Sequence, residues 1–198
     1  MFSIPLLYFI CSCSPATALV FANHTSTAYQ IFFQYPSDWE VTEKTNRFQE
    51  GPDISVSKVI PSDFGLITIG YINNTLNGVD PDPVTSKIYA FYREMIGDYT
   101  KEIRTIEDPS FVTMDGEKAG TFVISRKDKY DDDAVLLGIQ VWLVYSGYNE
   151  YLISFASKAS MFDSPEKVET RDNFIKSIKF LGNSSVPTSN ADLGRFAQ

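Results

Sequence analysis

Carboxylates make up most of the groups in this sequence that could do chemistry. Asp128, Asp131, Asp132 and Asp133 fall close together in an expected loop between two strands. Loops rich in carboxylate oxygens suit calcium or another hard cation. The spacing lacks the glycine and the closing glutamate of an EF-hand. We therefore expect a solvated acidic hairpin tip, and we keep a calcium site on these four residues as the alternative.

Other catalytic chemistry is not expected. A nucleophilic side chain is usually activated by a histidine, and the only histidine, His24, lies in the polar segment 23–27, where we expect no regular structure. Zinc and copper prefer imidazole or thiolate ligands, and both cysteines, Cys11 and Cys13, precede the expected mature chain. A carboxylate-based hydrolase is the least favoured class, because 25 acidic residues always offer some pair. We expect a non-enzyme without a cofactor and keep calcium as the alternative.

Tyrosines form the second group of candidate functional residues. Three tyrosines lie in or beside an expected turn at 146–150, namely Tyr145, Tyr148 and Tyr151. Tyrosine is enriched where proteins meet their partners. Tyr145 and Tyr151 fit a cross-strand pair in the core. Tyr148 lies in the turn itself, so we expect it to be exposed and take it as the candidate partner-binding residue.

The N-terminal segment predicts export. The first 37 residues carry no formal charge, and an apolar run at 2–10 is followed by small residues. This order is typical of a secretory signal peptide, although no Lys or Arg precedes the run. Cleavage is expected after Ala22, giving a signal at 1–22, with a second small-x-small site that ends at Ala18. The alternatives are a retained membrane anchor, a lipid on Cys13, or a cytosolic start.

Charge and glycosylation sequons agree with an extracytoplasmic, secreted protein. The net charge of −8 repels phosphate backbones, so no nucleic-acid partner is expected. Asn-x-Ser/Thr sequons occur at Asn23, Asn73 and Asn183, which are candidate glycosylation sites. No cysteine follows the expected signal, so the mature domain must be held together by packing.

The candidate residues are positioned by expected strands, in which apolar residues recur at every second position, and by expected helices, in which they recur at every third or fourth position. Strands are expected at 29–35, 54–60, 66–72, 111–114, 118–126, 135–145 and 151–156. A helix is expected at 80–104, capped by Asp82 with Pro83 in its first turn, and a second helix begins at Ser164. The later strands form an antiparallel meander. Its first hairpin turns at Asp115 and Gly116, where glycine supplies a positive φ.

These elements predict one α+β domain at 23–182, followed by a disordered tail at 183–198 that is rich in Ser, Asn, Pro and Thr. From the order of elements we expect both helices on one side of an antiparallel sheet. Trp39 and Trp142 are expected in or near the core.

Several short segments resemble PsbP-like proteins. They are residues 33–39, 114–119, 151–156 and 174–180, together with Phe162, and they follow the family order. The resemblance implies the PsbP fold, an α/β/α-like sandwich, and residence outside the cytoplasm. The chain resembles secreted archaeal-type relatives more than the photosystem II subunit. The imidazole contacts of that subunit have no counterpart here, because no histidine follows His24.

Together these observations favour an extracytoplasmic binding or assembly-accessory domain. Its expected partner is a protein or a membrane-associated complex, with membrane attachment through the N-terminus as an alternative to free secretion. The second hypothesis is a soluble carrier of a hard cation such as calcium.

Overall fold

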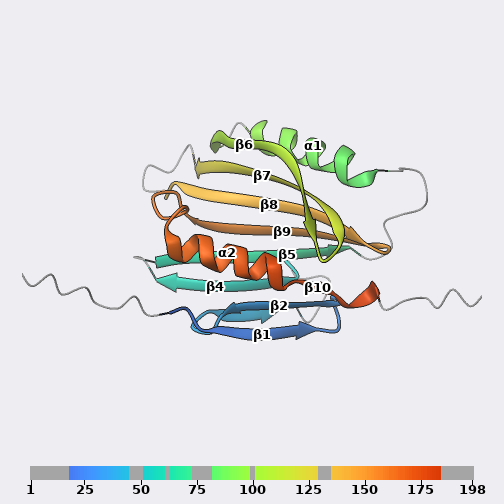
Figure 1. Ribbon diagram of the computed structural model, residues 1–198. Helices are drawn as coiled ribbons and strands as arrows, with labels where there is room; N and C mark the ends of the chain where they lie inside the picture. Colours follow the sequence, from blue (N-terminus) through green and yellow to red (C-terminus); the bar gives the residue numbers. More distant parts are fainter. Residues whose placement is uncertain are drawn as a thin grey trace, which may run out of the picture.

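The computed structural model describes residues 18–44, 51–60, 63–72, 82–98, 101–128 and 135–183. Figure 1 shows a large sheet, a helix on each of its faces and a small second sheet beside it. Two helices and two antiparallel sheets within the described residues confirm the predicted α+β class.

The large sheet is a seven-stranded antiparallel sheet in the order β3-β4-β5-β9-β8-β7-β6 within the described residues. Its strands are β3 (Glu40–Glu43), β4 (Ile54–Ile60), β5 (Asp63–Ile72), β6 (Lys101–Met114), β7 (Glu117–Asp128), β8 (Leu137–Ser146) and β9 (Asn149–Lys158). The predicted meander from β6 to β9 is confirmed. Asp115 and Gly116 form its first turn, with φ angles of 48° and 86°.

The small sheet contains β1 (Phe21–Ser26), β2 (Ile31–Pro36) and β10 (Lys179–Phe180), with β2 in the middle. The segment around His24, expected to lack regular structure, was therefore wrongly predicted. Its residues pair with β2 in antiparallel register, and the His24 ring lies 5.0 Å from the ring of Phe33. Backbone pairing, the contact of His24 with Glu43 at 2.5 Å and the contact with Phe33 order this polar strand.

Both helices begin at the predicted caps. The carboxylate of Asp82 accepts a hydrogen bond from the backbone N–H of Thr85 at 3.2 Å, and α1 spans Pro83–Ile96. The hydroxyl of Ser164 caps α2, which spans Pro165–Ser177. The prediction that the first helix continues to residue 104 is wrong. The chain leaves the helix at Gly97 and enters β6 at Lys101.

The two helices cover opposite faces of the large sheet. On one face Ile88 of α1 packs so closely on Gly120 that a Cβ there would lie 2.8 Å from the Ile88 Cβ. On the other face Phe174 of α2 shares a buried cluster with Trp142. Alternate residues of a strand point to opposite faces, so the sheet buries an apolar cluster on each side. The expectation of helices on one side is corrected, and the α/β/α layering implied by the resemblance is found.

The aromatic residues test the predicted register. Trp39 and Trp142 are buried, as predicted. Tyr145 and Tyr151 do not form the expected cross-strand pair, since Tyr151 lies opposite Val144. The turn contains only Gly147 and Tyr148, and Gly147 takes a φ of 59°. This shorter turn shifts the register by one residue, which places the two tyrosines on opposite faces.

Candidate functional site

A groove of about 390 Å³ lies on the α2 face of the large sheet, between α2 and β6. Its lining residues are Ile106, Glu107, Val112, Thr113, Val123, Gln140, Trp142, Phe162, Asp163, Arg171, Asp172, Ile175 and Lys176. All of them belong to the described part of the chain, and they come from three strands, one helix and the loop before that helix. We take this groove as the candidate functional site.

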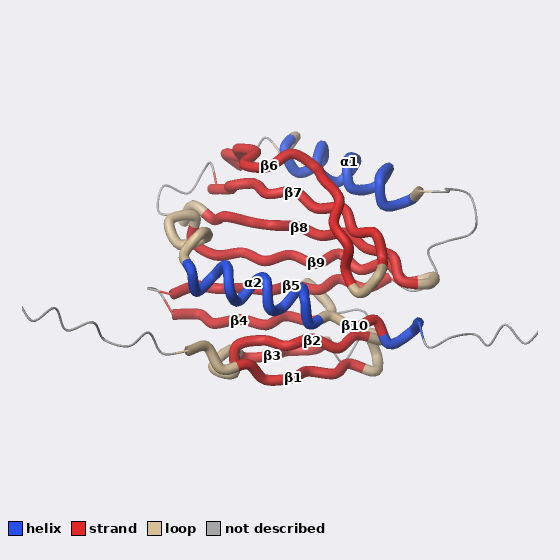
Figure 2. The backbone as a smooth tube through the Cα atoms, in the orientation of Figure 1, coloured by secondary structure: helices blue, strands red, loops and turns tan. Residues whose placement is uncertain are grey.

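Strand β6 forms one wall of the groove because it is irregular. Its pairing with β7 shifts between Thr105 and Glu107 and again between Glu107 and Ser110. Pro109 lies in the second shift, and proline, which lacks an N–H, is tolerated only at edge strands and bulges. Bulges bend a strand and increase its twist, and Figure 2 shows β6 curving across the sheet. The curve brings Ile106 and Val112, both exposed, to the groove.

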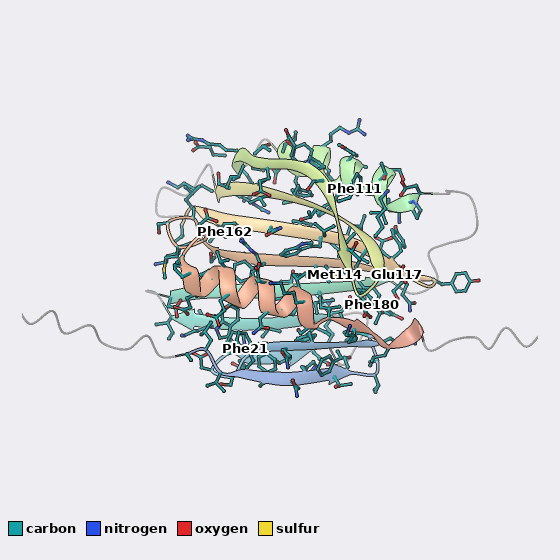
Figure 3. All side chains as sticks on the ribbon, in the orientation of Figure 1. Phe21, Phe111, Met114, Glu117, Phe162 and Phe180 are labelled. Carbon is teal, nitrogen blue, oxygen red and sulfur yellow. The ribbon has the colours of Figure 1, made fainter. Side chains whose placement is uncertain are left out.

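The floor and the opposite wall of the groove are aromatic. Trp142 of β8 is 3% exposed and forms the floor beside Gln140, whose amide donates to the Thr121 hydroxyl at 3.2 Å. Phe162 lies against β8 because position 138 is glycine. A Cβ there would lie 2.5 Å from the Phe162 ring. Figure 3 labels Phe162 near the start of α2.

The rim of the groove carries charges of both signs. The Arg171 guanidinium lies 4.8 Å from the centre of the Phe162 ring, and Lys176 approaches Asp172 at 3.5 Å. Among the described residues, no ion-pair partner is found for Arg171, Glu107 or Asp163. The groove therefore combines an apolar floor with charged side chains that are available to a ligand.

A hydrogen-bonded clamp holds the β6–β7 turn against the strand that follows α2. The Asp115 carboxylate accepts from Lys179 Nζ at 2.8 Å and from the Phe180 backbone N–H at 2.9 Å. Figure 3 shows Met114 and Phe180 close together at this junction. Burial alone would raise the pKa of Asp115, but the hydrogen bonds from Lys179 and Phe180 outweigh it and lower that pKa. The clamp fixes the spacing between the two walls of the groove.

A second polar cluster lies under the β8–β9 hairpin. The buried Glu150 carboxylate accepts hydrogen bonds from Tyr145 Oη and from Lys87 Nζ, both at 2.5 Å. Burial and the Glu150 contact raise the pKa of Tyr145 to about 12, and the hydrogen bond to Glu150 raises the pKa of Lys87. Near neutral pH Tyr145 keeps its proton and Lys87 keeps its charge. The cluster is therefore suited to fastening α1 rather than to removing a proton from a substrate.

A third cluster contains a fully buried lysine that the sequence analysis did not identify. Lys167 of α2 forms an ion pair with Asp63 and lies 5.4 Å from the Trp39 ring. Lys58 bridges Asp63 at 2.7 Å and Asp38 at 2.8 Å. The hydrogen bonds to Asp38 and Asp63 raise the pKa of Lys58, while those from the two lysines lower the pKa of Asp63 against the effect of burial. The network joins the β4–β5 hairpin to α2.

The predicted metal ligands fall at the edge of the described residues or beyond it. Asp128 ends β7, and Asp131, Asp132 and Asp133 lie outside the described residues, as the side chain of Asp128 also does. Among the described side chains, no group of three His, Cys, Asp or Glu residues could hold a metal ion. The acidic loop therefore stays a prediction.

Three of the other four predicted sites fall within the described residues, in the β8–β9 turn, β1 and η1. Tyr148 is 69% exposed at the tip of the β8–β9 hairpin, as predicted, and it is not a lining residue of the groove. Asn23 is exposed in β1, where its amide oxygen accepts from Gln34 Nε2 at 3.0 Å. Asn73 lies outside the described residues, and so does the side chain of Asn183 in η1 (Leu181–Asn183). No helix in the described segments has the length and apolar character needed to cross a membrane.

Comparisons with known proteins find likeness in structure only. No family model matches the sequence, and no curated protein matches it. A solution structure of cyanobacterial PsbP (CyanoP) from Synechocystis sp. PCC 6803 superposes with a TM-score of 0.56 at 13% identity, covering 83% of this chain and 97% of that one.

Two further structures share the arrangement. The Ran-binding protein Mog1p of Saccharomyces cerevisiae has a TM-score of 0.50 at 12% identity, over 83% of this chain and 97% of its own. LpqN of Mycobacterium tuberculosis, which is involved in cell envelope biogenesis, has a TM-score of 0.52 at 13% identity, over 82% and 91%. Identities this low establish the fold alone. The chain has the PsbP-like fold that its short segments predicted.

Proposed function

We propose that this chain is an extracytoplasmic, non-catalytic domain that holds a segment of a protein partner in the groove between α2 and β6. The observation that carries the proposal is the composition of this groove. An aromatic floor, exposed aliphatic side chains and charges of both signs occur together. Aromatic residues and arginine are enriched in protein interfaces, and a polar rim around an apolar centre is their usual arrangement.

The positions of the groove residues support a protein segment as the ligand. Ile106 is 54% exposed and Val112 is 40% exposed, so an apolar side chain of a partner would remove both from water. Arg171 and Glu107 line the groove, where each can pair with a group of opposite charge on the partner. Charges at a rim contribute to orientation and to the rate of association more than to affinity.

The similar structures fit a binding role without fixing its partner. Mog1p is a Ran-binding protein and LpqN is involved in cell envelope biogenesis. A fold does not by itself determine a function, so the argument for binding rests on the groove of this chain.

The extracytoplasmic location rests on the apolar, uncharged leader, and β1 helps to choose between its two cleavage sites. Phe21 pairs with Pro36 and Ala22 with Tyr35. Cleavage after Ala22 would remove both residues from β1, whereas cleavage after Ala18 keeps the strand whole. We therefore place the cleavage after Ala18 in this proposal.

Photo-crosslinking in cells that make the protein tests the groove. A benzoylphenylalanine is placed at Val112, in the groove, and in a matched control at Thr42, an exposed residue of β3 at the other edge of the sheet. We expect one defined protein adduct from position 112 and none from position 42. Adding Ile175→Arg, which puts a charge on the groove wall, should abolish that adduct. Equal adducts from both positions, or an adduct that survives Ile175→Arg, would contradict the proposal.

A further inference from the structure

The free edge of the large sheet runs along one wall of the groove. Strand β6 is the outermost strand of this sheet, and within the described residues it pairs with β7 alone. Val112 and Thr113 are consecutive in β6, and both line the groove. Successive side chains of a strand point to opposite faces of the sheet. Two consecutive lining residues therefore bring the backbone edge between them into the groove wall.

The turn between β6 and β7 determines which backbone groups of this edge are free. Met114 and Glu117 are partners on either side of a two-residue turn, so they exchange both of their backbone hydrogen bonds. Hydrogen-bonded and non-hydrogen-bonded pairs alternate along an antiparallel ladder. The N–H and C=O groups of Val112 therefore point to β7. Those of Phe111 and Thr113 point away from β7 and can pair with another strand.

Most of β6 is protected against a further strand, but its last part is not. Sheet edges are usually protected by charges, proline, bulges or a short strand length. Residues 101–109 include several charged side chains, Pro109 and both register shifts. The opposite edge, β3, has only four residues and begins and ends with Glu. Residues 110–114 of β6 carry no charge and no proline, and they pair with β7 in regular register.

The unprotected stretch also exposes apolar side chains on both faces of the sheet. Val112 shares a face with Met114, which belongs to the buried cluster beneath α2. Phe111 points to the opposite face, where Lys118 Nζ lies 4.3 Å from the centre of its ring. Both Phe111 and Val112 are exposed. Side chains of an added strand would alternate between the same two faces and pack against both residues.

We propose that the partner segment binds in extended form, as an additional antiparallel strand on residues 110–114 of β6. This inference rests on the protein-binding function proposed above and specifies how the groove holds its ligand. Backbone hydrogen bonds to Phe111 and Thr113 contribute affinity for any extended segment, while the groove selects among side chains. The partner residue opposite Val112 points into the groove and must be apolar, because the buried Trp142 forms the floor there.

Charge favours a different protein over a second copy of this chain as the occupant. Two copies that each carry −8 repel one another. Arg171 and Glu107 line the groove, and the ion pairs found among the described residues include neither of them. A carboxylate of the ligand can pair with Arg171, and a basic side chain can pair with Glu107. The occupant is therefore an extended segment of another protein that combines an apolar residue with charges of both signs.

Amide hydrogen exchange on the full chain tests for the added strand. Short random peptides displayed on phage are selected against the protein, and the probe is the tightest binder whose binding Ile175→Arg abolishes. Without the probe, the amides of Phe111 and Thr113 should exchange faster than that of Val112, because they face away from β7. With saturating probe, we expect both amides to slow by at least about tenfold. The amide of Thr42, at the other edge of the sheet, is the control and should keep its rate.

Thr113→Pro tests one of the two free N–H groups directly. Proline is tolerated in an edge strand where the missing N–H faces away from the ladder. The urea unfolding midpoint should therefore stay close to that of wild type, while the affinity for the probe should fall by about tenfold through the loss of one hydrogen bond. If Thr113→Pro does not fold, the exchange rates at positions 111 and 113 of the wild-type chain decide the question.

Three outcomes would overturn the proposal. The first is a probe that binds in the groove but leaves the exchange of Phe111 and Thr113 unchanged, in which case the groove holds its ligand without an added strand. The second is a selection that yields no peptide sensitive to Ile175→Arg. The third is protection that needs no probe and grows with protein concentration, which would assign this edge to a second copy of the chain. Failure of the proposed function is read separately, from the absence of a crosslinked adduct at Val112.

Discussion

The Asp115 carboxylate accepts a hydrogen bond from the backbone N–H of Phe180 at 2.9 Å, which ties the turn between β6 and β7 to the strand that follows α2. The two walls of the groove are thus connected at one end by a single side chain. Asp115 also pairs with Lys179. Its surroundings favour the ionised carboxylate over the neutral form, which makes the clamp sensitive to acid.

Replacing Asp115 by Asn should lower the free energy of unfolding by about 1 kcal/mol near neutral pH, because charge-assisted hydrogen bonds are lost. Asn tolerates the positive φ of this position, so the turn itself is kept. Urea unfolding measures the change. Asp172→Asn, which removes one partner of an exposed ion pair, is the control and should change stability by a few tenths of a kcal/mol at most.

The stability difference between wild type and Asp115→Asn should depend on pH. The pKa of Asp115 is lower in the folded protein than in the unfolded chain, so its contribution is complete above the unfolded pKa of about 4. That contribution disappears as the pH falls through the lower, folded pKa. The stability difference between wild type and Asp115→Asn should therefore be constant from pH 5 to 7 and shrink in more acidic solution. A difference that grows with acid would show that the clamp does not favour the carboxylate.

Trp142 should be the most costly groove residue to remove. It is 3% exposed and belongs to the buried cluster beneath α2. Trp142→Ala should reduce the free energy of unfolding by roughly 3 to 5 kcal/mol through lost burial and the cavity left behind. Denaturant unfolding followed by circular dichroism provides the measurement. A loss well under 1 kcal/mol would refute the role of Trp142 as the floor of the groove.

Arg171→Gln should separate binding from folding. Arg171 makes no ion pair with a described carboxylate, so its loss should leave the unfolding midpoint almost unchanged. The yield of the adduct crosslinked at Val112 should fall, because the guanidinium, which contacts the Phe162 ring, has no ion-pair partner among the described residues and can pair with a carboxylate of the ligand. If adduct yield and unfolding midpoint both match wild type, Arg171 has no part in recognition.

The acidic loop should behave as a solvated hairpin tip. Replacing Asp131, Asp132 and Asp133 together by Asn should leave folding intact. Calcium should bind more weakly than millimolar at physiological salt, because a specific site needs six to eight fixed oxygens. Calorimetry that finds micromolar, calcium-selective binding, abolished by the triple change, would reverse this prediction and favour the cation-carrier hypothesis.

Measuring the intact mass of the natural protein tests whether the N-terminal leader is removed. Cleavage after Ala18 should give a chain that begins at Leu19 and keeps Phe21 in its pair with Pro36. A chain beginning at Asn23 would contradict this choice of site. An unmodified full-length chain in the cytosol would contradict export.

Local signals predicted the parts of the fold that depend on neighbouring residues. Asp82 and Ser164 mark helix starts because a side-chain acceptor and a following proline act within one turn. Asp115 and Gly116 mark a hairpin because their positive φ angles are a local property. The register of Tyr145 was predicted wrongly, since it depends on whether two residues or five form the turn.

The groove could not be predicted in the same way. It depends on where β6 bends and on which helix face meets it, and both are set by contacts distant in sequence. Pro109 was the one local signal, because a proline inside a strand indicates an edge or a bulge. The burial of Lys167 could not be predicted either, because its partner Asp63 lies on a hairpin that is distant in sequence.

The pairing of β10 with β2 has a consequence for the order of folding. Phe180 lies opposite Ile31, and the Leu181 backbone N–H donates to the Gln30 carbonyl at 2.8 Å. Synthesis proceeds from the N-terminus, so the small sheet gains its third strand only when almost the whole described chain has left the ribosome. Contacts between such distant residues form slowly. A chain whose small sheet closes late stays unfolded for longer, which agrees with the export proposed above, because an unfolded chain can be threaded through a membrane.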